Sequence, residues 1–138
     1  DSLSVSVKNR ALKNVTVLPY QPFEEFQNLL LISDICLVTL KDGMERLSVP
    51  SRAYTFMSAG KPVIAMMNPE ADVAQLVING DCGWVIGDAS KLASLLKELS
   101  ENRDEATRKG LNAEEVYRKT LNKEKTIKRF SELIFEIT

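Results

Sequence analysis

Three residues in the middle of the chain have the chemistry that binds phosphate groups. Ser51 and Arg52 stand side by side where a helix is expected to begin, and Gly43 lies in the polar loop before them. Arginine offers a permanent positive charge in a planar fork of donors, and a helix N-terminus presents free backbone N–H groups. Glycine lets the backbone approach a ligand closely. This set predicts a diphosphate site, although an ordinary loop followed by a capped helix would carry the same residues.

Several other kinds of active site are excluded because the residues they need are missing. The chain contains no histidine, so a Ser-His-Asp triad cannot form and the commonest transition-metal ligand is absent. It also lacks the G-x-G-x-x-G and Walker phosphate loops, the G-x-S-x-G elbow and any D-x-D pair. Any catalysis must therefore use carboxylates or take its base from another domain. We interpret the loop carboxylates Asp42, Glu45 and Glu70 as solvated charges rather than catalysts.

A loop–helix–strand segment is expected to position the candidate residues. Pro50 fits the first turn of a helix, and Ser48 or Ser51 is available to cap its free N–H groups. Gly60 suits the left-handed residue that ends a helix, and the proline two residues later prevents the helix from continuing. Residues 63–67 are uniformly apolar, as in a strand that is covered on both faces.

The rest of the chain alternates strand and helix patterns, which favours an α/β fold with a parallel, Rossmann-like sheet, flanking helices and a helical C-terminal tail. Residues 1–13 fit either a strand or the end of a helix. Ligands bind beyond the carboxyl ends of the strands in such sheets, and the longest loop there is expected at 41–52. Further strands are expected at 14–19, 34–40 and 81–87, and further helices at 23–32, 72–78, 103–117 and 123–137, with one more after a cap at Asp88 or Ser90.

The composition fits one globular domain covering residues 1–138, with residues 1–13 as a poorly determined lead-in. Hydrophobic residues make up 44% and charged residues 27%, and the net charge is −1, so nothing indicates a nucleic-acid surface. Cys36 and Cys82 are interpreted as buried thiols, and Trp84 as core packing. The start is polar and the apolar runs are short, so neither a signal peptide nor a membrane span is expected. The last helix carries an apolar stripe formed by Ile127, Phe130, Ile134 and Ile137.

Seven short stretches of the chain form an ordered set: Asn14-Val15, Leu18-Pro19-Tyr20-Gln21-Pro22, Ser33-Asp34-Ile35, Leu37-Val38, Val49-Pro50-Ser51-Arg52, Ala59-Gly60-Lys61-Pro62-Val63-Ile64-Ala65 and Gly83-Trp84-Val85-Ile86. This order resembles that of a retaining glycosyltransferase of family 4, in the narrower group of colanic-acid, capsule and O-antigen transferases. The resemblance covers residues 14–138 and is specific as an ordered set rather than motif by motif. It implies an N-terminally truncated donor-binding domain of the two-domain GT-B fold, which needs no bound metal and no other cofactor.

The resemblance also implies which residues contact a nucleotide-sugar donor. Pro19 and Tyr20 correspond to positions where the backbone contacts the base, and Gly43 and Met44 to the loop near the sugar and the diphosphate. Ser51 and Arg52 correspond to the family's Ser and Lys beside the diphosphate. Thr55 corresponds to the glutamate that binds the ribose in many members.

Three positions depart from the family's pattern. Arg52 replaces a lysine, which keeps the charge but changes its geometry. Thr55 and Leu47 replace the two glutamates of the common E-x7-E pattern, so ribose binding should be weaker or differently arranged.

We therefore expect the nucleotide-sugar-binding part of a bacterial-type hexosyltransferase for cell-surface polysaccharide synthesis, inactive as this fragment. The parent would be cytoplasmic, at the inner face of the cell membrane, and its acceptor domain would precede this chain. A GT-B sugar epimerase and a non-catalytic nucleotide-binding or interaction module remain alternatives. Because the first strands of such a domain are absent, we also expect the chain to dimerise, swap elements or rearrange its first strand.

Overall fold

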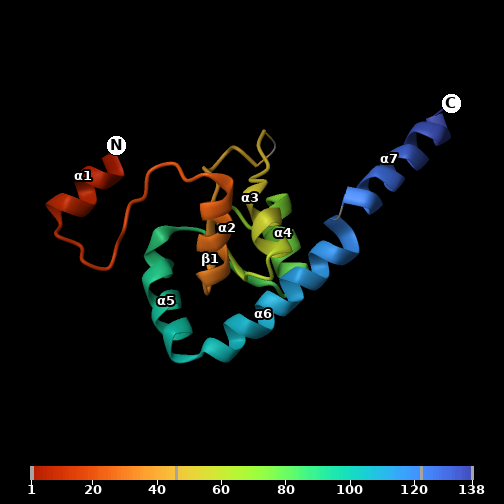
Figure 1. Cartoon of the computed structure of the whole chain (residues 1–138). Coiled ribbons are helices and arrows are strands. Elements are labelled where there is room, and N and C mark those ends of the chain that lie inside the picture. The colour runs from red at the N-terminus through yellow and green to blue at the C-terminus, as the bar shows by residue number, and fades with distance from the viewer. Residues whose placement is uncertain (1, 46, 122, 138) are drawn as a thin grey trace. The chain divides into compact units, whose positions relative to one another are not determined.

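The computed structural model describes residues 2–45, 47–121 and 123–137, and for residues 2, 136 and 137 the backbone alone. The chain forms two compact units, Asp1–Leu31 and Ile32–Thr138, which are treated separately below. The single-domain organisation stays a prediction. The elements are labelled in chain order in Figure 1.

Unit 1 contains helix α1 (Ser2–Asn9) and all but the last residue of helix α2 (Phe23–Ile32). The ambiguous lead-in is therefore helical in its first part. The strand expected at 14–19 is wrong, because these residues form a loop without strand pairing. Strand propensity reflects packing against neighbouring strands, and a run of branched residues with no strand beside it does not satisfy its backbone in a sheet.

Unit 2 is built on a three-stranded parallel sheet with the order β1-β2-β3. The strands are β1 (Cys36–Thr39), β2 (Val63–Met66) and β3 (Gly83–Ile86), and their carboxyl ends are in register, with Thr39 opposite Met66 and Met66 opposite Ile86. This confirms the parallel α/β sheet with flanking helices and a helical tail. The central strand β2 is apolar throughout because both of its faces are covered.

Helices connect the strands and complete the chain. Helix α3 lies between β1 and β2, and α4 lies between β2 and β3. After the last strand, all the described elements are helical. Their bounds are α3 (Arg52–Ser58), α4 (Asp72–Asn79), the 3₁₀ turn η1 (Ala89–Lys91), α5 (Leu92–Glu101), α6 (Arg103–Val116), the π-helical turn η2 (Tyr117–Leu121) and α7 (Lys123–Ile137).

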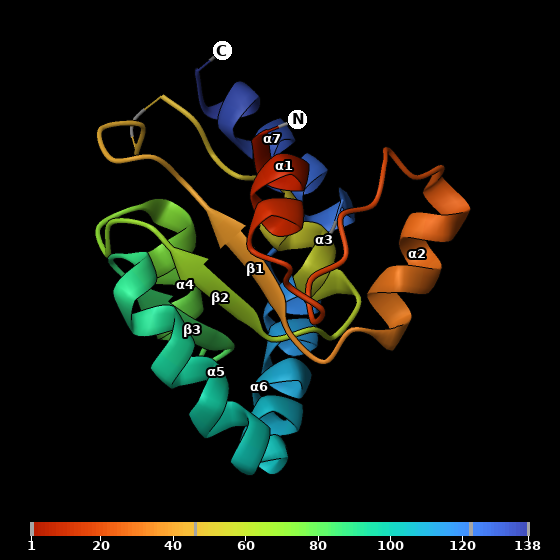
Figure 2. The same cartoon turned by 90° about the vertical axis from the view of Figure 1, so that its left-hand side faces the viewer.

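The helices cover both faces of the sheet. Helix α5 packs on one face, where Leu99 meets Ile64 and Ile86, with Trp84 at the margin of this cluster. Helices α3 and α4 lie against the other face (Figures 1 and 2). Met57 of α3 is fully buried. The sequence interpretation of Trp84 as core packing is thereby confirmed, since it packs against that cluster.

Two helices end in the same hydrogen-bonded motif. After α3, Gly60 has φ +67°, its N–H donates to the carbonyl of Met57 (3.0 Å), and the N–H of Lys61 donates to that of Phe56 (3.0 Å). This confirms Gly60 as the left-handed residue that ends the helix. After α4 the left-handed residue is Asp81, with φ +46°, and not the glycine before it.

The two predicted helix caps have opposite outcomes. The Asp88 carboxylate accepts a hydrogen bond from the N–H of Ser90 (2.7 Å), which confirms that cap. Of the two serines expected to cap α3, Ser51 makes no capping bond with its side chain, so that alternative is wrong. Its φ of −57° and ψ of −20° are already helical, whereas a capping residue needs an extended backbone to reach the next N–H groups.

Both cysteines are buried free thiols, as expected. Burial raises the pKa of Cys36 and of Cys82 to about 11, which keeps both thiols protonated. Neither is therefore a candidate nucleophile.

Candidate functional site

The candidate site lies at the edge of unit 2 where the three parallel strands end. Two loops rise from this edge, one of residues 40–51 after β1 and one of residues 67–71 after β2. Ligands of open parallel sheets bind at this edge because the loops there can vary while the strands hold them in place. Two neighbouring hollows are found there, and Val49 lines both of them.

The larger hollow, of about 670 Å³, is acidic. Its lining carboxylates come from both loops and from the start of α4, and no Lys or Arg lies among the described residues that line it. Gly43 stands at its rim with φ +82°, and its N–H donates to the Glu45 carboxylate (3.1 Å). The lining residues are Gly43, Glu45, Leu47, Ser48, Val49, Asn68, Glu70 and Asp72.

The smaller hollow, of about 370 Å³, contains the candidate cation. It is lined by residues 37–39 of β1 and by Val49, Pro50, Ser51 and Arg52 at the start of α3. Ser51 and Arg52 are exposed. The Ser51 hydroxyl makes no capping bond at the N-terminus of α3. Thr55 is exposed one turn further along α3, on the same side as Arg52.

The structure brings some of the predicted donor-binding residues together and leaves others apart. Ser51 and Arg52 share the smaller hollow, whereas Gly43 lines the larger one, and Met44 lines neither. Pro19 and Tyr20 belong to unit 1, where Tyr20 is 96% exposed, so they are described only within that unit.

The charges of the two hollows divide the site chemically. A diphosphate needs cations and hydrogen-bond donors, and an exposed guanidinium and hydroxyl offer both beside the smaller hollow. Carboxylates repel phosphate but accept hydrogen bonds from hydroxyl groups. The larger hollow therefore suits an uncharged, hydroxyl-rich group better than it suits a phosphate.

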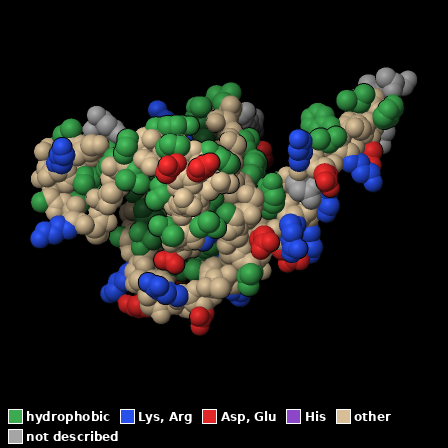
Figure 3. Space-filling model, in the orientation of Figure 1, with side chains coloured by type: hydrophobic (Ala, Val, Ile, Leu, Met, Phe, Trp, Pro, Cys, Tyr) green, Lys and Arg blue, Asp and Glu red, His purple; other side chains and the backbone are tan. Residues whose placement is uncertain are grey.

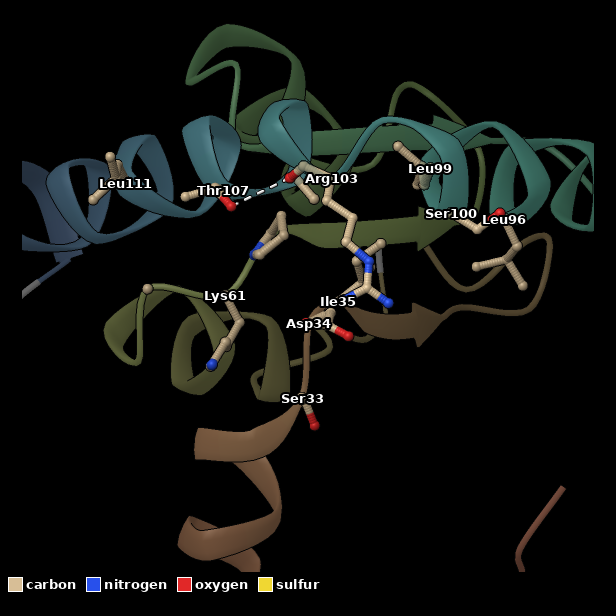
Figure 4. A pocket seen from close by; sticks show the side chains of 13 residues that line it. Ser33, Asp34, Ile35, Lys61, Leu96, Leu99, Ser100, Arg103, Thr107 and Leu111 are labelled. Carbon is tan, nitrogen blue, oxygen red and sulfur yellow. Dashed lines mark hydrogen bonds between the residues drawn. The ribbon is translucent and has the colours of Figure 1, made fainter. Parts of the chain in front are cut away.

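A third hollow, of about 560 Å³, lies at the opposite edge of the sheet, beside residues that precede β1 and β2 (Figure 4). Its polar groups include Asp34, Lys61 and Arg103, and its apolar wall includes Leu99 of α5. Because it lies at the amino ends of the strands, it is not where parallel sheets place their ligands. We give it no role in the site.

One polar cluster of unit 2 was missed by the sequence analysis. The Asp81 carboxylate pairs with both Arg108 and Lys109 of α6, and the Asn112 amide donates to the Asp81 carbonyl (3.0 Å). The Lys109 ammonium lies 5.2 Å from the centre of the Trp84 ring, a cation–π distance. These pairs span about thirty positions of sequence, so no local pattern signals them. They fasten α6 to the turn before β3 and touch neither hollow at the carboxyl edge.

No group of three or more Cys, Asp or Glu side chains that could hold a metal ion is found in the described part of the chain. In the same residues, no helix is long and apolar enough to span a bilayer.

Unit 2 is thus an α/β, Rossmann-like fragment with its candidate site at the carboxyl edge of the sheet. The chain is 37% identical over 102 residues to a Pseudomonas aeruginosa protein named probable glycosyltransferase WbjE. This similarity covers 70% of the chain, and it supports a relationship to glycosyltransferases in general. The chain spans about a quarter of that relative's length, since the match covers 26% of it. No family model and no solved structure matches the chain.

Proposed function

We propose that the chain is the donor-binding part of a retaining glycosyltransferase of family 4, one that uses a nucleotide-sugar to build a cell-surface polysaccharide. The observation that carries this proposal is the 37% identity to a protein named as a probable glycosyltransferase. The carboxyl-edge location of the two hollows is compatible with it. The chain by itself would be inactive, because the acceptor would be bound by a preceding domain of the same protein.

In the proposed complex the donor lies across both hollows. Its diphosphate contacts Ser51 and Arg52, and a hydroxyl-rich part of the donor faces the carboxylates around Gly43. When the bond between the sugar and the diphosphate breaks, negative charge grows on the departing diphosphate. The Arg52 guanidinium would stabilise this charge as it develops.

The same proposal accounts for the residues that depart from the family pattern. Thr55 lies beside Arg52 but offers one hydroxyl instead of two carboxylate oxygens. The contact with the ribose is then weaker, and phosphate contacts supply a larger share of the donor's binding energy. The parent protein would act in the cytoplasm, at the inner face of the cell membrane.

Calorimetric titration of UDP and GDP into the protein at its full natural length tests the proposal. Arg52→Ala should weaken binding of the preferred nucleotide by about 10- to 100-fold, as expected for a lost charged hydrogen bond. Arg103→Ala is the matched control, because Arg103 is exposed at the opposite edge of the sheet. The proposal would be refuted if the protein bound neither UDP nor GDP, or if the Arg52→Ala variant bound as tightly as the unmodified protein. Either result would favour a non-catalytic module.

A further inference from the structure

The two hollows at the carboxyl edge of unit 2 differ in charge, and the proposed donor lies across both. In that complex the diphosphate contacts Ser51 and Arg52, and Val49 lines both hollows, so the sugar attached to the diphosphate enters the larger one. The volume of the larger hollow, about 670 Å³, is within the range of small-molecule sites, roughly 300–1,000 Å³. The charge of its lining therefore bears on which sugar the donor carries.

Three carboxylates line the larger hollow, and each belongs to a locally ordered segment. Glu45 is half-buried, and its carboxylate accepts a hydrogen bond from the Gly43 N–H (3.1 Å). Glu70 lies in a tight turn in which its N–H donates to the Asn68 side chain (2.9 Å). Asp72 is the first residue of α4. The negative charges are thus presented from the loop after β1, the loop after β2 and the helix that follows it.

These carboxylates are not neutralised within unit 2. None of the three forms an ion pair with a Lys or Arg among the described residues. Counting every residue of 40–51 and 67–72 gives two basic and four acidic side chains, a net charge of −2. The two segments around the larger hollow are therefore negative as a whole.

The cations of unit 2 are concentrated in another segment. Residues 118–129 contain six Lys and Arg residues and one acidic residue, and Figure 3 shows Lys and Arg side chains grouped around the junction of η2 and α7. The exposed stripe of α7, formed by Ile127, Phe130 and Ile134, lies in the same part of the chain. The Ile137 side chain of the expected stripe lies outside the described residues. No residue of this segment lines either hollow at the carboxyl edge.

We infer that the donor sugar carries no acidic group, and that Glu45, Glu70 and Asp72 reject nucleotide-sugars of uronic acids. An uncharged sugar donates hydrogen bonds from its hydroxyl groups to carboxylate oxygens, whereas a sugar carboxylate would add a like charge beside them. The inference rests on the proposed donor-binding function and names the class of sugar, which that proposal leaves open.

Competition between UDP-glucose and UDP-glucuronate for the protein at its full natural length tests the inference. The two donors share the nucleotide and the ring hydroxyls and differ only at carbon 6, where one has a hydroxymethyl group and the other a carboxylate. We expect UDP-glucuronate to bind at least about tenfold more weakly, the order expected for like charges about 8 Å apart near a protein surface. If the protein prefers GDP, GDP-mannose and GDP-mannuronate form the corresponding pair.

Charge-removing variants show whether the carboxylates cause the discrimination. Glu70→Gln combined with Asp72→Asn should lower the affinity ratio of the two donors by at least about threefold, because both side chains keep their size and lose their charge. Glu70→Gln alone, in an exposed loop position, should lower it in the same direction. The matched control is Glu98→Gln with Glu101→Gln, which removes the same charge from exposed positions of α5, whose second half lines the hollow at the opposite edge. This control should keep the ratio of the unmodified protein.

The outcomes separate the inference from the proposed function. If the protein binds UDP or GDP but has equal affinity for the two sugars of a pair, the inference is wrong and the proposed function stands. That result would include the case in which a preceding domain brings a cation to the hollow, since the full-length protein contains it. An unchanged ratio in the Glu70 and Asp72 variants, or an equal fall in the control, would also overturn the inference. Failure to bind either nucleotide would refute the proposed function and the inference with it.

Discussion

At the scale of residues, Arg52 and Asp81 illustrate two uses of charge in this chain. Arg52 is exposed beside a hollow at the carboxyl edge of the sheet, where a ligand can reach it. Asp81 is bound by Arg108 and Lys109 of the same unit, so its charge is used to hold the fold together. Nucleotide binding should therefore depend on the first residue, and stability on the second.

Substitution of Asp81 separates its charge from its backbone conformation. Asp81→Ala removes the carboxylate beside the buried Lys109 and retains a left-handed residue with a Cβ, so it should destabilise unit 2 by about 1–3 kcal/mol. Asp81→Gly removes the same carboxylate, but glycine adopts a φ of +46° without strain. The Gly variant should therefore lose about 1 kcal/mol less stability than the Ala variant. Urea unfolding of the three proteins measures the difference. Equal stability of the two variants would contradict the argument from conformation.

The same residue predicts an acid dependence of stability. Hydrogen bonds from Arg108 and Lys109 lower the pKa of Asp81 to about 2. A carboxylate whose pKa is depressed by folding stabilises the folded state above its unfolded pKa of about 4, and this contribution is lost as the pH falls towards 2. Unfolding measured across this range should show a steeper acid loss in the unmodified chain than in Asp81→Asn. Parallel pH profiles would exclude this role for Asp81.

At the scale of elements, the contact between α3 and α6 depends on two glycines. A Cβ on Gly110 of α6 would lie 2.4 Å from the Gly60 carbonyl oxygen and 3.2 Å from Pro62 Cδ. A Cβ on Gly60 would meet only ordinary contacts of 3.8 Å or more. Gly110 is therefore needed for the close packing of α6, whereas Gly60 is needed for its own left-handed backbone conformation.

Gly110→Ala should therefore destabilise unit 2 even though alanine favours a helix by about 1 kcal/mol. We expect a net loss of about 2 kcal/mol or more, because the new methyl group must displace backbone atoms that are already packed. Thermal unfolding compares this variant with Leu111→Ala, the next residue of α6, which is 65% exposed and should change stability little. A Gly110→Ala protein that is as stable as the unmodified chain would show that α6 can shift to accommodate the methyl group, which would contradict the prediction.

At the scale of the whole molecule, β1 is an edge strand, because among the described residues of unit 2 it pairs with β2 alone. In β1 the N–H groups of Cys36 and Leu40 donate to carbonyls at the two ends of β2. Backbone groups point to opposite sides of a strand at successive residues, so those of Leu37 and Thr39 point away from β2. Leu37 is also 44% exposed. Unpaired edge strands of this kind promote association with another chain.

We therefore predict that the isolated chain self-associates through β1. Leu37→Lys should shift the mass measured by light scattering towards that of a monomer, because a charge on an edge strand opposes pairing. Leu96→Lys is the control, since Leu96 is similarly exposed (46%) but lies on α5. A monomeric unmodified chain, or an equal effect of both variants, would exclude pairing through this edge.

Local sequence determined most of the elements of unit 2. Gly60 ended α3, Asp88 capped the turn that leads into α5, and the apolar run of β2 became a strand covered on both faces. Each of these features depends on only a few neighbouring residues. The same kind of reasoning failed at 14–19, where the residues favour a strand but a sheet also requires a partner. It failed at Ser51 because the backbone of that residue is already helical, whereas a capping side chain needs an extended backbone.

Only the tertiary structure decided how charges are distributed around the candidate site. Sequence placed Gly43 and Arg52 on one loop, but the fold puts them at two neighbouring hollows and brings Glu70 and Asp72 beside the first of them. It also brought Asp81 to Lys109 and left the stripe of α7 exposed. A residue's own type and its near neighbours determine its local conformation, whereas contacts between distant segments follow from how the helices pack on the sheet.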